Sequence, residues 1–277
     1  MDSLKRLFGL SVYTKISARA CLIASLVLFV ALIGVYLLAS HERHQENPND
    51  KIMPTISQLT QGVQKMATPD RNGEITLMVD TIASLKRFFL GVIAGATMAI
   101  ALGVALGLFP IVEAVFHRFL LYLSKIPPLA LLPVIFIFSG LGESTKILLI
   151  IVGISLPITL DTYLRVKKDL PREQLVKALT LGASTPAVVW HIVFPQIMPA
   201  ALNSVRLNLL GAWLFLIAGE AIAADAGLGY RIFVVRRYMA MDTIIPYVFW
   251  IAFLSFSLDA LLSWWIKRHY SWYEERN

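Results

Sequence analysis

The sequence predicts an all-α membrane protein with six transmembrane helices. Three observations support this fold class: 57% of the 277 residues are hydrophobic, only 16% are charged, and the mean hydropathy is +0.68. A soluble domain usually has about a quarter charged residues. The net charge of +7 does not indicate a nucleic-acid surface, because Lys and Arg lie mostly between apolar runs. The single cysteine, Cys21, excludes an internal disulfide.

Six segments come close to the roughly 20 mostly apolar residues that cross a membrane. They are residues 20–39, 84–108, 119–138, 147–164, 205–224 and 243–266. The first run is too long for the apolar core of a cleavable signal peptide. An even number of spans places both termini on one side. Cytoplasmic termini put fifteen of the 25 Lys and Arg residues inside, as the positive-inside rule favours.

These spans divide the chain into five expected parts. The parts are a cytoplasmic N-terminal segment (1–19), a first transmembrane helix (20–39), an outer loop (40–83), a core transmembrane domain (84–266) and a cytoplasmic C-terminal tail (267–277). In the outer loop Ile56, Leu59, Val63 and Met66 recur near helical spacing, which predicts a short surface helix.

The second span carries a strip of small residues at every fourth position. Its members are Gly91, Gly95, Ala99, Gly103 and Gly107. Such a strip allows close backbone approach between helices in a membrane. We therefore expect this face to pack inside the helix bundle.

The third span has prolines at positions 127, 128 and 133. Pro127 and Pro128 remove backbone donors and disfavour regular helix. Broken helices at membrane depth are tolerated where they are buried or line a cavity. The break is either a lining of a translocation pathway or a structural kink.

A helix–glycine–helix unit follows the fourth span. Leu175, Ala178 and Leu179 form one apolar stripe, which predicts a short helix. Gly182 is placed to end it, because glycine adopts the left-handed conformation at low cost.

Thr185 and Pro186 are a suitable cap and first residue for a second helix, expected over residues 186–194. Pro195 and Pro199 then mark a rigid link, or hinge, to the fifth span. The unit has two interpretations: it lies at lipid headgroups, or it docks a cytosolic partner by a helix-in-groove contact.

This segment resembles the cytoplasmic loop of binding-protein-dependent ABC importer permeases, which carries an EAA sequence, a glycine and a downstream proline stretch. The matching stretches are VKA at 176–178, LGAS at 181–184, VFP at 193–195 and MP at 198–199. Val176 and Lys177 replace the leading Glu and the first Ala. Further stretches resemble the nitrate/sulfonate/taurine/bicarbonate type of these permeases: SKIPPLALLP at 124–133, GLGESTKI at 140–147, GEAIAADAGLGY at 219–230 and YSW at 270–272.

The resemblance implies a type I ABC importer permease, a multi-pass protein of the bacterial inner (plasma) membrane. Its implied partners are a second copy of itself, cytosolic ABC ATPase subunits that bind ATP and Mg, a periplasmic substrate-binding protein and membrane lipid, with no nucleic acid. The coupling-helix loop would be residues 171–199. Its implied ATPase-docking residues are Leu175, Ala178, Leu179, Gly182, Ala183 and Ser184.

The chain has no GxxxxGK[ST] phosphate loop, so ATP hydrolysis is expected on a separate subunit. We expect this chain to be a transport subunit and not an enzyme, with no catalytic residue, cofactor or metal of its own.

Five residues are candidates for the pathway or gate: Pro127, Pro128, Asp161, Glu220 and Asp225. Glu220 ends the fifth apolar run, where a carboxylate needs a partner or water. Permeases of the family tend to have an acid there, so Glu220 has either a shared structural or gating purpose or a direct contact with substrate. Asp161 either lines the path or is solvated at the interface. Asp225 is expected at an outer gate or at a contact with the binding protein.

The charge of the substrate stays open. Arg231, Arg236 and Arg237 on the outer side suit an anion funnel, a contact with acidic residues of the binding protein, or a solvated loop. The acids would suit a cation. Resemblance alone suggests nitrate, bicarbonate, sulfonates or taurine, passed from the binding protein by alternating access. The alternatives are a stand-alone ion-coupled secondary transporter, with Asp161 or Glu220 as carrier, and a membrane scaffold without transport.

Overall fold

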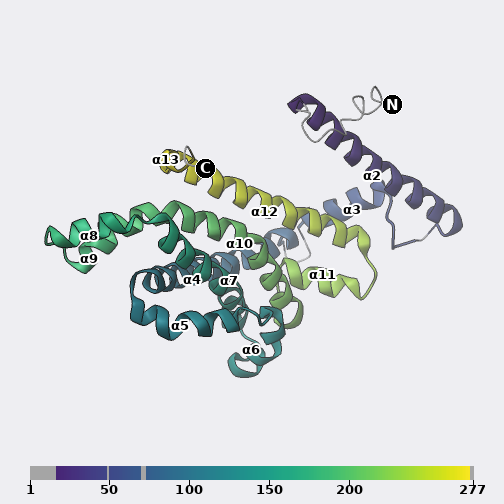
Figure 1. The fold of residues 1–277 in the computed structure, drawn as a ribbon. Coiled ribbons are helices and arrows are strands. Elements are labelled where there is room, and N and C mark those ends of the chain that lie inside the picture. The colour runs from purple at the N-terminus through teal and green to yellow at the C-terminus, as the bar shows by residue number, and fades with distance from the viewer. Residues whose placement is uncertain (1–16, 49, 70–72, 275–277) are drawn as a thin grey trace. The chain divides into compact units, whose positions relative to one another are not determined.

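A computed structural model describes residues 17–48, 50–69 and 73–274 (Figure 1). These residues are helical apart from turns, loops and one isolated bridge between Pro69 and Ile75, so the all-α class is confirmed. Most of the expected N-terminal segment 1–19 and the last three residues of the tail lie outside the described residues. The chain forms two compact units, residues 1–61 and 62–277, which are described separately.

The first unit contains one long helix, α2 (Ala18–Glu46), long and apolar enough to cross a membrane. It continues past the expected end at residue 39, so the first residues of the expected outer loop, up to Glu46, are helical. Arg43 then binds Asp50 at 2.7 Å, which lowers the pKa of Asp50.

The predicted surface helix is present as α3 (Ile56–Ala67). The backbone N–H of Thr55 donates to Gln58 Oε1 at 2.9 Å, and that of Gln58 donates to Thr55 Oγ1 at 3.3 Å. This reciprocal pair is a capping box, which fixes where the helix begins.

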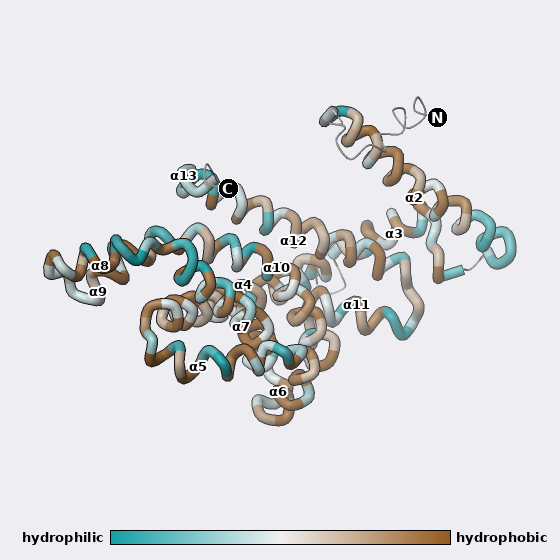
Figure 2. Tube along the Cα trace, viewed as in Figure 1, coloured by the Kyte–Doolittle hydropathy of each residue, from teal (hydrophilic) through white to brown (hydrophobic). Residues whose placement is uncertain are grey.

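The second unit is built on long apolar helices, along which hydrophobic residues predominate (Figure 2). Its helices are α4 (Thr76–Leu108), α5 (Pro110–Leu123), η1 (Pro128–Leu131), α6 (Leu132–Ser139), α7 (Glu143–Asp169), α8 (Arg172–Thr180), α9 (Thr185–Val188), η2 (Val189–Val193), α10 (Phe194–Ala223), α11 (Leu228–Arg236), α12 (Met241–His269) and α13 (Ser271–Glu274). Several begin before or end after the expected spans, because helix continues into the polar residues that flank each apolar run.

The small-residue strip of α4 packs inside the bundle, as predicted. A Cβ placed on Gly91 would meet Ile150 of α7 at 2.7 Å, and one on Gly107 would overlap Val166. Contacts therefore advance in the same direction along both helices, so α4 and α7 run parallel. Close packing of this kind is the usual use of small residues between membrane helices.

The third expected span, residues 119–138, is not one straight helix. α5 and the η1–α6 segment are bent by 86° at a break of no more than four residues. The break falls at Pro127 and Pro128, where the missing donors prevent helical hydrogen bonds. Because α4 and α7 are parallel, the bent pair must carry the chain back along their whole length. It therefore counts as one crossing, and the described helices provide six candidate crossings.

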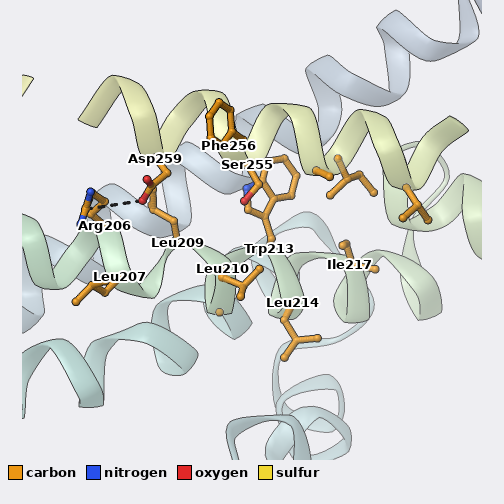
Figure 3. A pocket seen from close by; sticks show the side chains of 14 residues that line it. Arg206, Leu207, Leu209, Leu210, Trp213, Leu214, Ile217, Ser255, Phe256 and Asp259 are labelled. Carbon is orange, nitrogen blue, oxygen red and sulfur yellow. Dashed lines mark ion pairs between the residues drawn. The ribbon is translucent and has the colours of Figure 1, made fainter. Parts of the chain in front are cut away.

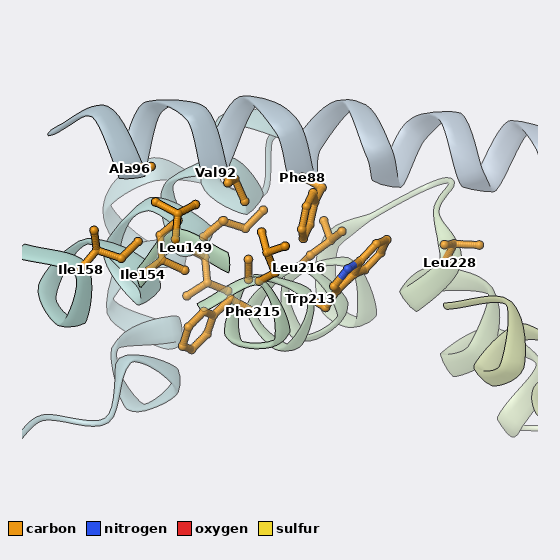
Figure 4. Packing of buried hydrophobic residues seen from close by; sticks show 14 of the residues in the cluster. Phe88, Val92, Ala96, Leu149, Ile154, Ile158, Trp213, Phe215, Leu216 and Leu228 are labelled. Carbon is orange, nitrogen blue, oxygen red and sulfur yellow. The ribbon is translucent and has the colours of Figure 1, made fainter. Parts of the chain in front are cut away.

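α10 runs antiparallel to α4 and α7, because its contacts advance in the opposite direction: Phe215 lies against Gly153 and Gly219 near Lys146, while Trp213 meets Phe88 and Glu220 meets Ser84. Figure 4 shows the packed core of these helices. Phe88 of α4 stacks on Trp213 of α10 with ring centroids 4.6 Å apart. Gly153 of α7 lies against the ring of Phe215, where a Cβ would overlap it. These large side chains fill the space between the three helices.

The helix–glycine–helix unit, residues 171–193, is called the knob below. Gly182 ends α8 with φ +87°, as predicted, and the backbone N–H of Ala183 donates to the carbonyl of Ala178 at 3.0 Å. The cap of the second helix is Ser184, whose Oγ accepts from Ala187 N at 3.4 Å, and not Thr185.

The second helix does not end at Phe194 as expected. Helix continues from α9 through the π-helix η2 into α10, with Pro195 in its first turn and Pro199 inside it. Proline inside a helix loses its own hydrogen bond and its ring crowds the carbonyl four residues before it, and the π-helix η2 adjusts the bonding just before Pro195. The hinge role of these prolines stays a prediction.

Candidate functional site

The ends of the long helices differ in chemistry. Figure 1 shows α8 and α9 at one end of α10, and α11 lies toward the other. At the α11 end six charged side chains lie together: Asp80, Arg87, Glu143, Lys146, Glu220 and Arg231. We call these the charged cluster. Three are cations and three are anions, so the cluster is neutral as a whole.

Glu220 stands at the centre of the cluster and is 0% exposed. Ser84 Oγ donates to its carboxylate at 2.8 Å, Arg87 Nη1 at 2.7 Å and the backbone N–H of Gly229 at 2.9 Å. A buried carboxylate is tolerated when it is paired and hydrogen-bonded in this way. The structure thus provides the partners that the sequence required of Glu220.

Asp80, also 0% exposed, holds the start of α11. Its carboxylate accepts from Gly227 N at 2.9 Å, Arg231 Nε at 2.8 Å and Tyr247 Oη at 2.9 Å. Burial lowers the pKa of Arg231, but the hydrogen bond to Asp80, the charge of Asp80 and the nearby Tyr247 and Tyr230 together raise that pKa above its ordinary value. Asp80 therefore joins α4, α11 and α12 at one point.

Hydrogen bonds from its own backbone hold the loop before α11 against the cluster. Three successive N–H groups, from Gly227, Leu228 and Gly229, donate to Asp80, Ser84 and Glu220 respectively. These are the first donors of α11, which have no partner inside the helix. Acidic acceptors at a helix N-terminus are also favoured by the helix dipole.

Glycine is required in this loop for steric reasons. Gly227 has φ +137°, and a Cβ there would come within 2.6 Å of the Glu220 carboxylate. A Cβ on Gly229 would lie 2.8 Å from the carbonyl of Ile217. The GLG sequence therefore reflects close approach of the backbone to two acids.

Glu143 extends the cluster to the surface. Its side chain is 61% exposed, whereas its partners Arg87 and Lys146 are 7% and 3% exposed. Arg87 Nε and Nη2 donate to the two oxygens of Glu143 at 2.5 and 2.9 Å, and Lys146 Nζ donates at 2.6 Å. Arg87 thus bridges an enclosed acid and an exposed one.

Sequence reasoning missed most of this site. Asp80, Ser84 and Arg87 are spaced at i, i+4 and i+7, so they lie on one face of α4. An arginine within an apolar span is as costly as an acid and calls for a partner. The sequence could therefore have predicted the pairing of Arg87 with Glu220, because each is a costly charge within an apolar span.

Of the other candidate pathway residues, Asp225 lies beside the cluster, next to Ala226, whose carbonyl accepts from Arg87 Nη1 at 2.7 Å. Asp161 is partly exposed on α7 and lies 3.7 Å from Arg165, one turn away. Asp225 is exposed in the loop that the cluster clasps. Pro127 is exposed and Pro128 half-buried at the break between α5 and α6.

The predicted docking residues of the knob divide into two groups. Leu179, Gly182 and Ser184 are exposed, whereas Leu175, Ala178 and Ala183 pack partly against a buried cluster that includes Val104, Val166 and Ile197. Three large apolar residues that the prediction omitted are also exposed there: Val176, Leu181 and Trp190. A folded surface of this kind is typical of a protein–protein contact.

A groove of about 900 Å³ lies between α10 and α12 (Figure 3). Leu210, Trp213, Leu214 and other apolar side chains line it. Arg206 and Asp259, 3.8 Å apart, lie at one end of it. Its lining is too apolar to bind a small polar solute by itself, so it suits lipid chains or another helix better.

Comparison with known proteins finds relatives of this chain. The family model described as "Binding-protein-dependent transport system inner membrane component" matches residues 91–272. The chain is similar to the taurine transport system permease protein TauC of Escherichia coli (strain K12), with 31% identity over 223 residues, covering 80% of this chain and 81% of that protein.

It is also similar to the nitrate import permease protein NrtB of Synechococcus elongatus, with 26% identity over 193 residues and 68% of each chain covered. Among solved structures, an amino acid ABC transporter with histidines matches with a TM-score of 0.53 and 17% identity. That match covers 69% of this chain and 92% of the other, and it supports the fold alone.

Proposed function

This chain belongs to the family of inner membrane components of binding-protein-dependent transport systems, and from that premise we propose that it imports a small polar solute of the taurine, sulfonate or nitrate class. It is a multi-pass membrane protein and the permease subunit of an ABC importer. The proposal concerns the solute, the assembly and the route of coupling.

The knob is the observation that carries the coupling proposal. It is folded, stands beyond the last turns of the long helices, and exposes Leu179, Leu181 and Trp190. We infer that these side chains enter a cleft of a cytosolic ATPase subunit, since apolar helix faces commonly dock in grooves. The docking surface then consists of Val176, Leu179, Leu181, Gly182, Ser184 and Trp190, with Leu175, Ala178 and Ala183 supporting it from below.

The rest of the proposed assembly is built around this docking. The knob end faces the cytoplasm, both termini lie there, and the charged cluster faces the binding protein outside. Two copies of the chain form the pathway. ATP and Mg bind to the ATPase subunits, whose closure moves the knobs and changes which side of the pathway is open.

The ion-coupled alternative gains no support from the geometry. A carrier carboxylate must exchange its ion with water, yet Glu220 is enclosed and accepts bonds from Ser84, Arg87 and Gly229. Asp161 lies on the flank of α7 beside Arg165.

The test is co-purification of the gently solubilised chain with its ATPase subunit. We expect the unaltered chain to retain the ATPase and the Leu179→Asp and Gly182→Pro variants to lose it. Leu141→Asp is the matched control, because Leu141 is an exposed leucine at the other end of the bundle. Equal retention by all four proteins would exclude docking through the knob.

A further inference from the structure

The ion pairs of Glu143 are unusual in their burial. Most buried charges have a partner that is buried with them, as Glu220 has Arg87. Here Arg87 and Lys146 are enclosed, but the carboxylate that joins them belongs to a largely exposed residue. Glu220 offsets one of these two enclosed cations, and enclosing the other is costly unless a second anion is at hand. The pair therefore calls for a second anion without requiring that it be Glu143.

The donors are arranged as an oxyanion site. Arg87 presents Nε and Nη2 as a planar fork to two oxygens of Glu143, and Lys146 adds a third donor to one of them. This fork recognises any group with two oxygens on one centre. Carboxylate, nitrate and sulfonate all have that feature.

The net charge of the cluster without Glu143 also indicates an anion site. Asp80 and Arg231 neutralise each other, which leaves Arg87, Lys146 and Glu220 with a sum of +1 once Glu143 is set aside. A single monovalent anion restores neutrality. The anionic groups in the names of the relatives, sulfonate and nitrate, carry that charge.

The position of Glu143 would also allow its carboxylate to move away from Arg87 and Lys146. Glu143 begins α7 directly after Gly140 and Gly142, and a Cβ on Gly140 would meet nothing within 4 Å. The Glu143 side chain is already 61% exposed, whereas those of Arg87 and Lys146 are 7% and 3% exposed.

We propose that Arg87 and Lys146 form a binding site for the oxyanion group of the transported solute, in which the Glu143 carboxylate takes the solute's place when none is bound. This inference rests on the proposed function, because it requires a solute with an oxyanion group. The site lies at the end away from the knob, where the solute would arrive from the binding protein. Displacement by Glu143 would then help release the solute onward.

Thermal unfolding of the purified permease–ATPase complex tests the site, with nitrate and methanesulfonate as probes and chloride holding the ionic strength constant. We expect Glu143→Ala to be stabilised by the oxyanions at about tenfold lower concentration than the unaltered chain, because removing an internal competitor raises the apparent affinity. Glu143→Gln, which keeps the size of the side chain, is expected to respond in the same direction.

Glu113→Ala is the control, since Glu113 also binds a lysine, Lys167, at 2.6 Å, but a partly solvated one without an arginine fork. Equal oxyanion dependence in the unaltered chain and both Glu143 variants would overturn the proposal and leave a structural ion pair. An equal response of Glu113→Ala would overturn it as a general charge effect.

Uptake into proteoliposomes that contain the ATPase and the binding protein decides whether the site serves transport. We expect Glu143→Ala to lower both the half-saturating solute concentration and the maximal rate, with ATP hydrolysis retained. Tight anion binding with unchanged uptake would overturn the assignment to the pathway. If the unaltered importer carries no oxyanion solute, the proposed function fails, while the unfolding experiment still judges the anion site.

Discussion

The charged cluster and the knob differ in which side chains they bury and which they expose. At the cluster, charged side chains lie inside the bundle, and each described acid there accepts bonds from at least two donors. At the knob, large apolar side chains lie outside it, and Leu181 is 88% exposed. The cluster satisfies its groups within the chain, whereas the knob leaves large apolar side chains exposed. The comparison separates a region whose side chains are bonded within the chain from one whose apolar surface contributes little to the fold.

The largest expected effect comes from removing the cation at the centre of the cluster. Arg87→Met leaves Glu220 enclosed with no charged partner, so we expect the free energy of unfolding to fall by about 3–5 kcal/mol. Thermal unfolding in detergent measures this change. Arg165→Met is the control, because Arg165 is partly exposed and its pairs are long, so we expect a loss of no more than about 1 kcal/mol. Similar losses in both variants would remove the distinction between enclosed and surface pairs.

A smaller effect is expected where the cluster requires glycine. Gly227→Ala places a Cβ against the Glu220 carboxylate at a strained backbone angle, which we expect to cost about 1–3 kcal/mol or more. Gly140→Ala has a positive φ of 74° but open space around it, so it isolates the backbone part of the cost. The same unfolding measurement compares the two. A loss for Gly227→Ala no greater than that for Gly140→Ala would mean that the loop shifts freely away from Glu220.

The smallest effect is expected at the knob. Leu181→Ser removes a side chain that contacts little within the chain, so the free energy of unfolding should change by no more than about 0.5 kcal/mol. Ile197→Ser, from the enclosed cluster beneath the knob, should lower it by several times that amount. A large loss for Leu181→Ser, measured on the isolated chain, would show that the knob surface stabilises the fold itself.

Local pattern was enough for the helices and for the turn of the knob. Hydropathy located the spans, the spacing of Ile56 to Met66 located α3, and Gly182 marked the end of α8. The break at Pro127 and Pro128 was visible for the same reason, since proline removes a donor wherever it stands. The predicted ends of the helices were less accurate, because α2 and α4 extend into flanking residues whose polarity is typical of loops.

The sequence by itself determined the all-helical class, the number of apolar crossings and the position of the knob, because each depends on residues close together along the chain. Tertiary structure alone decided that α4 and α7 run parallel, that Leu175 faces inward while Leu181 faces outward, and that Glu220 meets Arg87. Arg87 and Glu220 are 133 residues apart. Their pairing depends on how three helices pack, and no periodicity within one helix records that.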